Sequence, residues 1–209
     1  MDHLGVFGCV LRVLFTKISH AIICDVSKII FGLDVSTSVT GICILNSETT
    51  PDGRGSQILH LDRIEFKKCK TFWEKADLTN LELRGLFKKY PGTYRVALEE
   101  PLMGFRTGMS SAATITTLRR FNGIVSYISR EIFGVDPEYI SSASARKLCG
   151  IKMQKTAKAG MSGKEQVFKY MSENDLGHVD WPKKKNGEPV DWSRDATDAY
   201  VIARAASLM

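Results

Sequence analysis

The stretch KIIFGLDVSTSVTGICIL, residues 28–45, constrains the fold more than any other part of the chain. Residues 29–35 and 41–46 are rich in Val, Ile and Leu, and they bracket a turn of Ser and Thr, which is typical of a β-hairpin. One carboxylate, Asp34, interrupts the first apolar run. Because an unpaired charge is costly beside a buried surface, Asp34 needs a compensating partner. The hairpin therefore predicts both a sheet and a functional site at its acidic residue.

Alternating strand and helix patterns follow the hairpin. Strand patterns are found at 29–35, 41–46, 57–66, 94–100 and 138–141. Helical patterns are found at 71–90, at about 111–133, near 164–173 and in the C-terminal segment that follows Ser193 as N-cap. Three strands and then helix, strand, helix, strand and helix predict an α/β fold, a mixed five-stranded sheet flanked by helices.

Residues 29–209 are predicted to form one domain, because 44% hydrophobic content over this length can bury a sizeable core. Residues 1–28 are an N-terminal extension, in which Arg12 interrupts the apolar run VFGCVLRVLF and no cleavage signature follows. Secretion is not expected; an accessory helix, organellar targeting and an upstream start codon stay open. No run approaches the roughly 20 apolar residues that span a membrane. The five cysteines lack metal-site spacing, which favours reduced structural thiols in a reducing compartment such as the cytoplasm.

Positive charge is concentrated in one part of the chain. The net charge is +6, and residues 146–185 hold ten Lys or Arg against four acids, so this segment accounts for the whole excess. Such a segment is a candidate phosphate-binding surface, and a solvated lysine-rich loop is the alternative. The candidate contacts are Arg146, Lys147, Lys152, Lys155 and Lys158. Trp181 and Trp192 flank a lysine run in the polar loop 178–192, where they either stack on bases or anchor the loop.

Four carboxylates occupy positions where burial is expected. Asp34 and Glu99 each end an apolar strand, and Asp195 and Asp198 are spaced i, i+3 on the helix stripe that is expected to pack on the sheet. Each acid alone has an ordinary explanation, such as a turn, an ion pair or a helix N-terminus. Together, acids from three segments at one sheet end would repel unless a multivalent cation holds them. Hard oxygen donors suit Mg²⁺, with Mn²⁺ as a substitute. We expect two such ions, acting together in a two-metal scheme.

The segments FGLDVSTSVTG, VALEE, GKEQV and RDATDAYVIARAA together resemble the RuvC-type Holliday junction resolvases of the RNase H-like superfamily, particularly phage-type members. The resemblance covers about residues 29–209. It depends on a set in a fixed order: Asp at the end of the first strand, Glu at the end of the fourth, and Asp-x-x-Asp at the start of the last helix.

The resemblance implies a homodimer that binds branched DNA, four-way junctions above all, and nicks two strands symmetrically as a metal-dependent, structure-selective endonuclease. By position, four residues resemble the catalytic, metal-binding carboxylates of the family: Asp34, Glu99, Asp195 and Asp198. Lys164 in GKEQV resembles a lysine that assists at the phosphate. The helix AATITTLRRFNGIVSYISRE resembles the long helix that the family uses in dimerisation.

Two positions depart from the family pattern. Where bacterial members have a further functional lysine, this chain has Ala145, with two basic residues beside it. Where they have an aromatic residue just after the catalytic Glu, this chain has Leu102, and Met103 or Phe105 is the substitute expected to contact DNA. Both departures concern junction geometry and leave the expected metal site unchanged.

Other functions stay open. An RNase H-like nuclease could instead cut other branched DNA or RNA/DNA hybrids, because dimer spacing and loops decide the substrate. A binding scaffold with a lapsed site is disfavoured, since all four acids are present. GLDVSTSVTG also resembles the phosphate-binding hairpin of sugar kinases and actin-like ATPases. Those ATP-binding proteins need a second such domain, for which 209 residues leave no room.

Overall fold

The computed structural model describes residues 28–48, 56–101 and 111–209. Within them one sheet has the strand order β3-β2-β1-β4-β5. Its members are β1 (Lys28–Asp34), β2 (Val39–Asn46), β3 (Gln57–Glu65), β4 (Thr93–Glu99) and β5 (Glu138–Ile140). β2 runs antiparallel to both of its neighbours, whereas β1, β4 and β5 are parallel to one another. The mixed five-stranded sheet predicted from the sequence is therefore confirmed.

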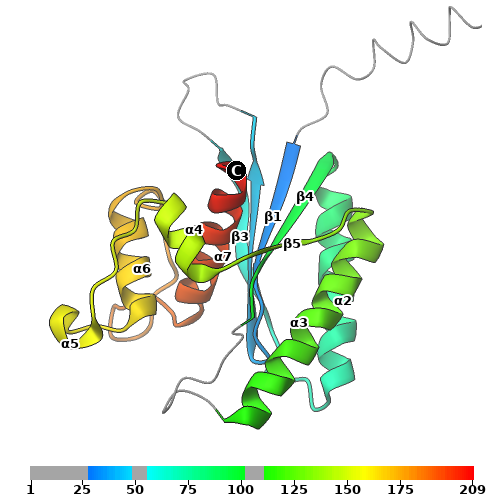
Figure 1. The fold of residues 1–209 in the computed structure, drawn as a ribbon, viewed down its shortest axis with the longest axis horizontal. Coiled ribbons are helices and arrows are strands. Elements are labelled where there is room, and N and C mark those ends of the chain that lie inside the picture. The colour runs from blue at the N-terminus through cyan, green and yellow to red at the C-terminus, as the bar shows by residue number, and fades with distance from the viewer. Residues whose placement is uncertain (1–27, 49–55, 102–110) are drawn as a thin grey trace, which may run out of the picture.

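Helices cover both faces of the sheet (Figure 1). One face carries α2 (Phe72–Lys89) and α3 (Ala112–Phe133), and the other carries α4 (Ser142–Leu148), α6 (Gly163–Glu173) and α7 (Trp192–Ser207). α5 (Thr156–Ala159) precedes α6 and lies away from the sheet. The four long helices were predicted, while α4 and α5 were missed because seven and four residues are too few to show a helical period.

The alternation of side chains along β1 separates two apolar clusters. Phe31 and Leu33 are fully buried against α2 and α3, whereas Ile30 belongs to the cluster that α7 completes on the opposite face. Because successive residues of a strand point to opposite faces, Asp34 has the same orientation as Ile30 and faces α7. The strand pattern alone thus directs this carboxylate toward the last helix.

The start of α7 differs from the sequence prediction. Ser193 was predicted as the N-cap, but the helix begins at Trp192, and Asp191 holds the cap position without a side-chain cap hydrogen bond. The Ser193 hydroxyl instead donates to the Val190 carbonyl oxygen at 2.7 Å and is buried. The prediction of Ser193 as N-cap is therefore wrong, because its hydroxyl is turned back into the preceding loop. The shift leaves Asp195 in the first turn of α7.

Two predictions concern the ends and the environment of the chain. The predicted extension lies outside the described residues except for Lys28, so its boundary stays a prediction. In the part of the chain that the structure describes, no helix has the length and apolar character needed to cross a membrane.

Candidate active site

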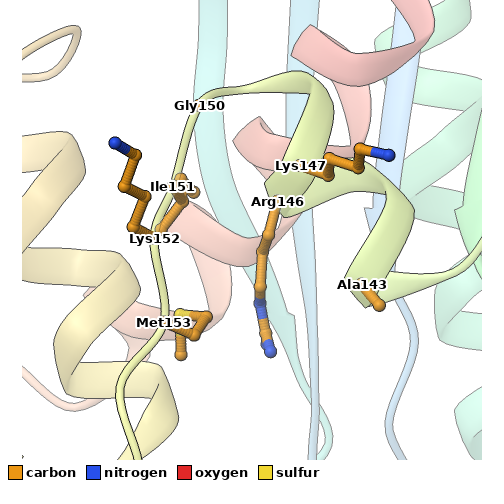
Figure 2. A pocket seen from close by; sticks show the side chains of 7 residues that line it. All are labelled: Ala143, Arg146, Lys147, Gly150, Ile151, Lys152 and Met153. Atoms are coloured by element: carbon orange, nitrogen blue, oxygen red, sulfur yellow. The ribbon is translucent and has the colours of Figure 1, made fainter.

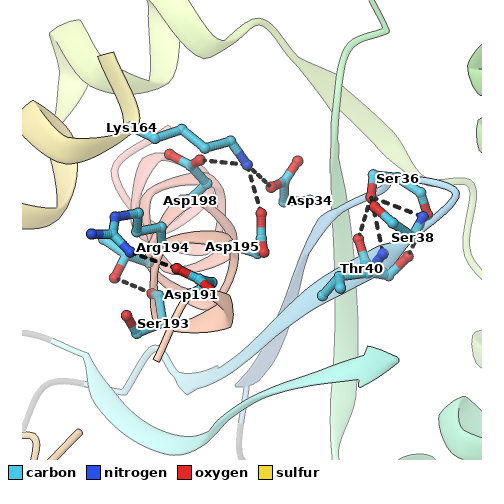
Figure 3. Close-up of polar contacts among 12 residues, drawn as sticks. Asp34, Ser36, Ser38, Thr40, Lys164, Asp191, Ser193, Arg194, Asp195 and Asp198 are labelled. Atoms are coloured by element: carbon cyan, nitrogen blue, oxygen red, sulfur yellow. Dashed lines mark hydrogen bonds and ion pairs between the residues drawn. The ribbon is translucent and has the colours of Figure 1, made fainter. Parts of the chain in front are cut away.

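Asp34 is the last residue of β1 and pairs in register with Gly41 of β2. Only 8% of Asp34 is exposed. The hairpin turn that follows it is held by Ser36, whose hydroxyl accepts from the Val39 amide at 3.1 Å and donates to the Val39 carbonyl at 2.6 Å (Figure 3). The acid is therefore fixed at the end of a central strand by a turn that bonds to itself.

α7 approaches this hairpin unusually closely because two positions in the strands are glycine. A Cβ added at Gly41 would lie 2.1 Å from the main-chain oxygen of Asp195, and one at Gly32 would lie 2.5 Å from that of Ala199. Glycine within a strand often marks such an approach of another backbone. The contact at Gly41 brings the first turn of α7, and thus Asp195, beside the end of β1.

Lys164 lies in the first turn of α6 and places its ammonium among three carboxylates (Figure 3). The distances from Nζ are 3.4 Å to Asp34 Oδ2, 2.7 Å to Asp195 Oδ1 and 3.3 Å to Asp198 Oδ2. Residues that are predicted independently from three distant parts of the sequence thus converge on one positive charge.

Glu99, the last residue of β4, faces the same site. Its carboxylate accepts a hydrogen bond from the hydroxyl of Ser142, at the start of α4. Its main-chain oxygen accepts from the buried Asn122 Nδ2 of α3 at 3.2 Å. Helices on both faces of the sheet therefore hold Glu99. We call Asp34, Glu99, Asp195 and Asp198 the carboxylate cluster.

Burial and neighbouring negative charge raise the pKa values of two acids in the cluster. Burial raises the pKa of Asp34 to about 7; the charge of Lys164 opposes the rise, and the neighbouring Glu99 adds to it. Burial and the charge of Asp34 raise the pKa of Asp198 to about 6. For Lys164, burial disfavours the ammonium, but the carboxylates outweigh it and raise its pKa. One lysine therefore does not fully compensate these acids.

The donor set fits a hard divalent cation. Carboxylate oxygens from β1 and α7 already surround one positive charge, and oxygen donors of this kind are what Mg²⁺ and Mn²⁺ prefer. Among the described residues, no three His, Cys, Asp or Glu side chains are grouped closely enough to share one ion. The physical reason is that the carboxylates are arranged around the Lys164 ammonium, which takes the central position.

The predicted DNA contacts lie beside the cluster on the α7 face of the sheet. Arg146, Lys147 and Lys152 line a hollow of about 400 Å³, and their side chains fan out in different directions (Figure 2). Arg146 is close enough to Asp198 for its charge to lower the pKa of that acid. Lys155 and Lys158 are exposed at α5. We call these five residues the α4–α5 basic surface.

Three other predicted residues have different outcomes. Phe105 lies outside the described residues, so its contact with DNA stays a prediction. Trp181 is 8% exposed and packs edge to face with Trp192. The guanidinium carbon of Arg63 lies 4.1 Å from the centre of the Trp192 ring. Of the two readings for these tryptophans, the packing favours anchoring of the 178–192 loop over stacking on bases.

Sequence reasoning missed Gly41 and Ser142. Gly41 stood inside the quoted hairpin motif, and glycine in an apolar strand was the available signal. Ser142 gave no signal, because its hydroxyl meets Glu99 across 43 positions of sequence and its neighbours are further small polar residues. Ala145 is fully buried, and the positive charge of α4 lies on the neighbouring Arg146 and Lys147.

Comparison with known proteins rests on structure. No family model and no curated protein sequence matches the chain. Thermus thermophilus RuvC, solved in complex with a Holliday junction substrate, matches with a TM-score of 0.60 and 14% identity over 86% of this chain and 93% of that chain. A further structure of this RuvC matches with a TM-score of 0.57 and 17% identity, again over 86% of this chain and 93% of that chain.

The yeast mitochondrial Holliday junction resolvase Ydc2 also matches, with a TM-score of 0.54 and 16% identity over 86% of this chain and 77% of that chain. The α/β sheet and its helical layers are shared, over 93% of the RuvC chain and 77% of the Ydc2 chain. The chain therefore has the fold of the RuvC-like Holliday junction resolvases, as the motifs in its sequence predicted.

Proposed function

We propose that this protein is a metal-dependent endodeoxyribonuclease that resolves four-way DNA junctions by paired nicking. The observation that carries the proposal is the convergence of three carboxylates, from β1 and α7, within 3.4 Å of one ammonium. The fold shared with T. thermophilus RuvC, which was solved with a Holliday junction substrate, supports the choice of DNA substrate.

The carboxylate cluster would hold the metal, Mg²⁺ with Mn²⁺ as a substitute. Bound ions would supply an activated water and would stabilise the leaving 3′ oxygen of an in-line attack on phosphorus. Asp34, at the end of a central strand and facing both Glu99 and α7, is the residue best placed to serve two ions. Its burial excludes bulk water from the carboxylate, which strengthens its hold on a cation.

Lys164 and the α4–α5 basic surface would act on the phosphates. The Lys164 side chain is 48% exposed, so its ammonium can leave the carboxylates and reach the substrate once another cation balances them. There it would offset negative charge that develops on the phosphate. Arg146 and the surface lysines would contact neighbouring phosphates in a sequence-independent way.

Paired nicking requires two sites, so we propose a homodimer. α3 resembles the family's dimerisation helix in sequence, and Tyr127 on it is 62% exposed. Sedimentation equilibrium at the concentrations used for cleavage tests this point, and a monomer that still makes paired nicks would contradict it. Because its proposed substrate is branched DNA, we place the protein where such DNA arises, in the cytoplasm at a nucleoid or a viral replication site.

Cleavage of four labelled substrates tests the function: a four-way junction, a flap, a linear duplex and an RNA/DNA hybrid, each with and without Mg²⁺. We expect symmetric paired nicks in the junction, only with the metal, and none with Asp34→Asn. The Asn side chain keeps the volume of Asp34 but removes the charge that the cation needs. Preferred cutting of the flap or the hybrid would favour the broader RNase H-like alternative, and no cutting of any substrate would remove the nuclease proposal.

A further inference from the structure

A second group of lysines lies at the same end of the sheet as the carboxylate cluster. β3 runs antiparallel to β2, with Glu65 opposite Val39, so the chain leaves β3 at the end where β1 finishes at Asp34. The connection from β3 to α2 reads KKCK, residues 67–70 (Figure 1). Acidic residues elsewhere in the chain balance these lysines in the net charge, so an average of charge along the sequence does not reveal them.

The two leading lysines are presented by a hydrogen-bonded turn. The Cys69 amide donates to the Phe66 carbonyl oxygen at 2.9 Å, which closes a turn with Lys67 and Lys68 at its central positions. Phe66 is buried, and its amide donates to the Ser38 carbonyl oxygen at 3.0 Å. The turn is therefore docked rigidly onto the hairpin that carries Asp34.

A hollow of about 370 Å³ lies between this turn and that hairpin, lined by Thr37, Ser38, Val39, Glu65, Phe66, Lys67 and Lys75. The Lys75 ammonium donates to the Thr37 carbonyl oxygen at 2.7 Å, which ties α2 to the hairpin. Lys75 is thus engaged in the structure, whereas the side chains of Lys67 and Lys68 are exposed and form no ion pair with any described residue.

Two acids stand close in sequence, and both have other partners. The Glu65 carboxylate lies 3.8 Å from Arg63. The Glu74 carboxylate accepts from the Lys70 and Thr71 amides and so closes the capping box of α2. Positive charge therefore dominates at the turn itself.

We propose that the Lys67–Lys68 turn, with Lys70 and the adjacent hollow, is a second phosphate-contact surface that takes the backbone of duplex DNA. It leads into the α2 layer, whereas the α4–α5 basic surface lies on the α7 face, so the two surfaces flank the carboxylate cluster. A duplex whose phosphate reaches the cluster can then be held on both sides. This inference rests on the proposed function for its DNA partner and adds the residues that the sequence analysis did not assign.

The test compares two double variants with the same charge change, Lys67→Gln with Lys68→Gln and Lys88→Gln with Lys89→Gln. Lys88 and Lys89 are exposed in the last turn of α2, at the other end of a helix that is roughly 27 Å long at 1.5 Å per residue. Binding of a labelled four-way junction is measured by fluorescence anisotropy in EDTA over a range of salt concentrations.

We expect the first variant to flatten the slope of log Kd against log salt by about 2, since each lost phosphate contact removes about 0.9. The Lys88/Lys89 variant should keep the wild-type slope, and Lys67→Arg with Lys68→Arg should restore it. Equal slopes for the two glutamine variants would overturn the proposal.

Chemical acetylation gives a second reading that needs no variant. The junction should protect Lys67 and Lys68 from acetylation, read by mass spectrometry, and leave Lys88 and Lys89 reactive; equal reactivity of the two pairs in the complex would overturn the proposal. Binding is measured without cutting, so a protein that binds but does not cut counts against the nuclease and leaves the lysine comparison intact.

Discussion

The carboxylate cluster and the α4–α5 basic surface lie side by side but are built in opposite ways. The cluster draws its residues from β1, β4 and α7, buries Asp34 and Asp198, and shifts their pKa values. The basic surface comes from one short stretch of chain, and its lysines are exposed. In the cluster, the side chains interact strongly, so the properties of each acid depend on the positions of the others. In the basic surface, each charge acts separately.

This difference predicts two kinds of response to mutation. Interactions within a shared network are not additive, whereas distant exposed charges contribute independently. Changes in the cluster should therefore act on cutting in large steps and leave binding intact. Changes in the basic surface should act on binding, gradually and in proportion to charge.

The largest effect is expected for Glu99→Gln, with Glu100→Gln as its control. Glu99 belongs to the cluster and accepts a hydrogen bond from Ser142, while its neighbour Glu100 is exposed just beyond the end of β4. Junction cutting by the first variant should fall at least about 10²-fold, comparable with the loss of one transition-state donor, with unchanged binding. The control should cut at the wild-type rate. Parallel loss of cutting and binding in Glu99→Gln would show that the carboxylate cluster and the α4–α5 basic surface do not act separately.

Next in size is Gly41→Ala, compared with Gly85→Ala. A methyl group at Gly41 would meet the backbone of Asp195, whereas nothing lies within 4 Å of a Cβ at Gly85 in α2. Overpacking should lower the free energy of unfolding by about 1–3 kcal/mol, and the displaced α7 should slow cutting about 10²-fold. Gly85→Ala should raise stability by about 0.5–1 kcal/mol without affecting cutting. Urea unfolding and single-turnover cleavage measure both, and a fully active Gly41→Ala would show that α7 need not approach so closely.

A smaller effect is expected in the pH dependence of stability without divalent ions. The folded-state pKa of Asp198 is about 6, above the ordinary Asp value of 3.8, so its stabilising contribution is complete below about 3.8 and is lost as the pH rises through about 6. Asp198→Asn should therefore lose less unfolding free energy than wild type between pH 4 and 7, by on the order of 1–3 kcal/mol.

Urea midpoints in EDTA at several pH values measure this difference, with the exposed Asp77→Asn as the control that keeps the wild-type dependence. If Asp198→Asn and wild type follow the same pH curve, burial of this carboxylate does not govern the cluster.

The smallest effect per residue concerns the basic surfaces. Lys147→Gln with Lys152→Gln should flatten the salt dependence of junction binding by about 2, and adding Lys67→Gln and Lys68→Gln should flatten it by about 4 in total. Single-turnover cutting at saturating protein should change little. A combined effect well away from the sum would mean that the two surfaces grip the junction cooperatively, unlike the independent charges inferred above.

The acids and the sheet could be predicted because local patterns encode them. Asp34 and Glu99 end apolar strands, and Asp195 with Asp198 repeats at helical spacing, so period and position were enough. Lys164 was identified only through a resemblance, since an exposed lysine in a helix is ordinary. Ser142 and Asn122 were not predictable, because each depends on a contact between segments far apart in sequence. Gly41 offered the signal of a glycine in an apolar strand, but the segment that approaches it was not predictable.

The sequence by itself determined the order of the strands and of the four long helices, the face of β1 on which Asp34 lies, and the identity of the four acids, since these follow from the repeat of side chains along regular elements. Only the tertiary structure decided that three of the acids meet at one ammonium and that a lysine turn after β3 stands beside them. Burial and close packing bring distant segments together, and electrostatic energy depends on the resulting distances, which no count of charges along a chain contains.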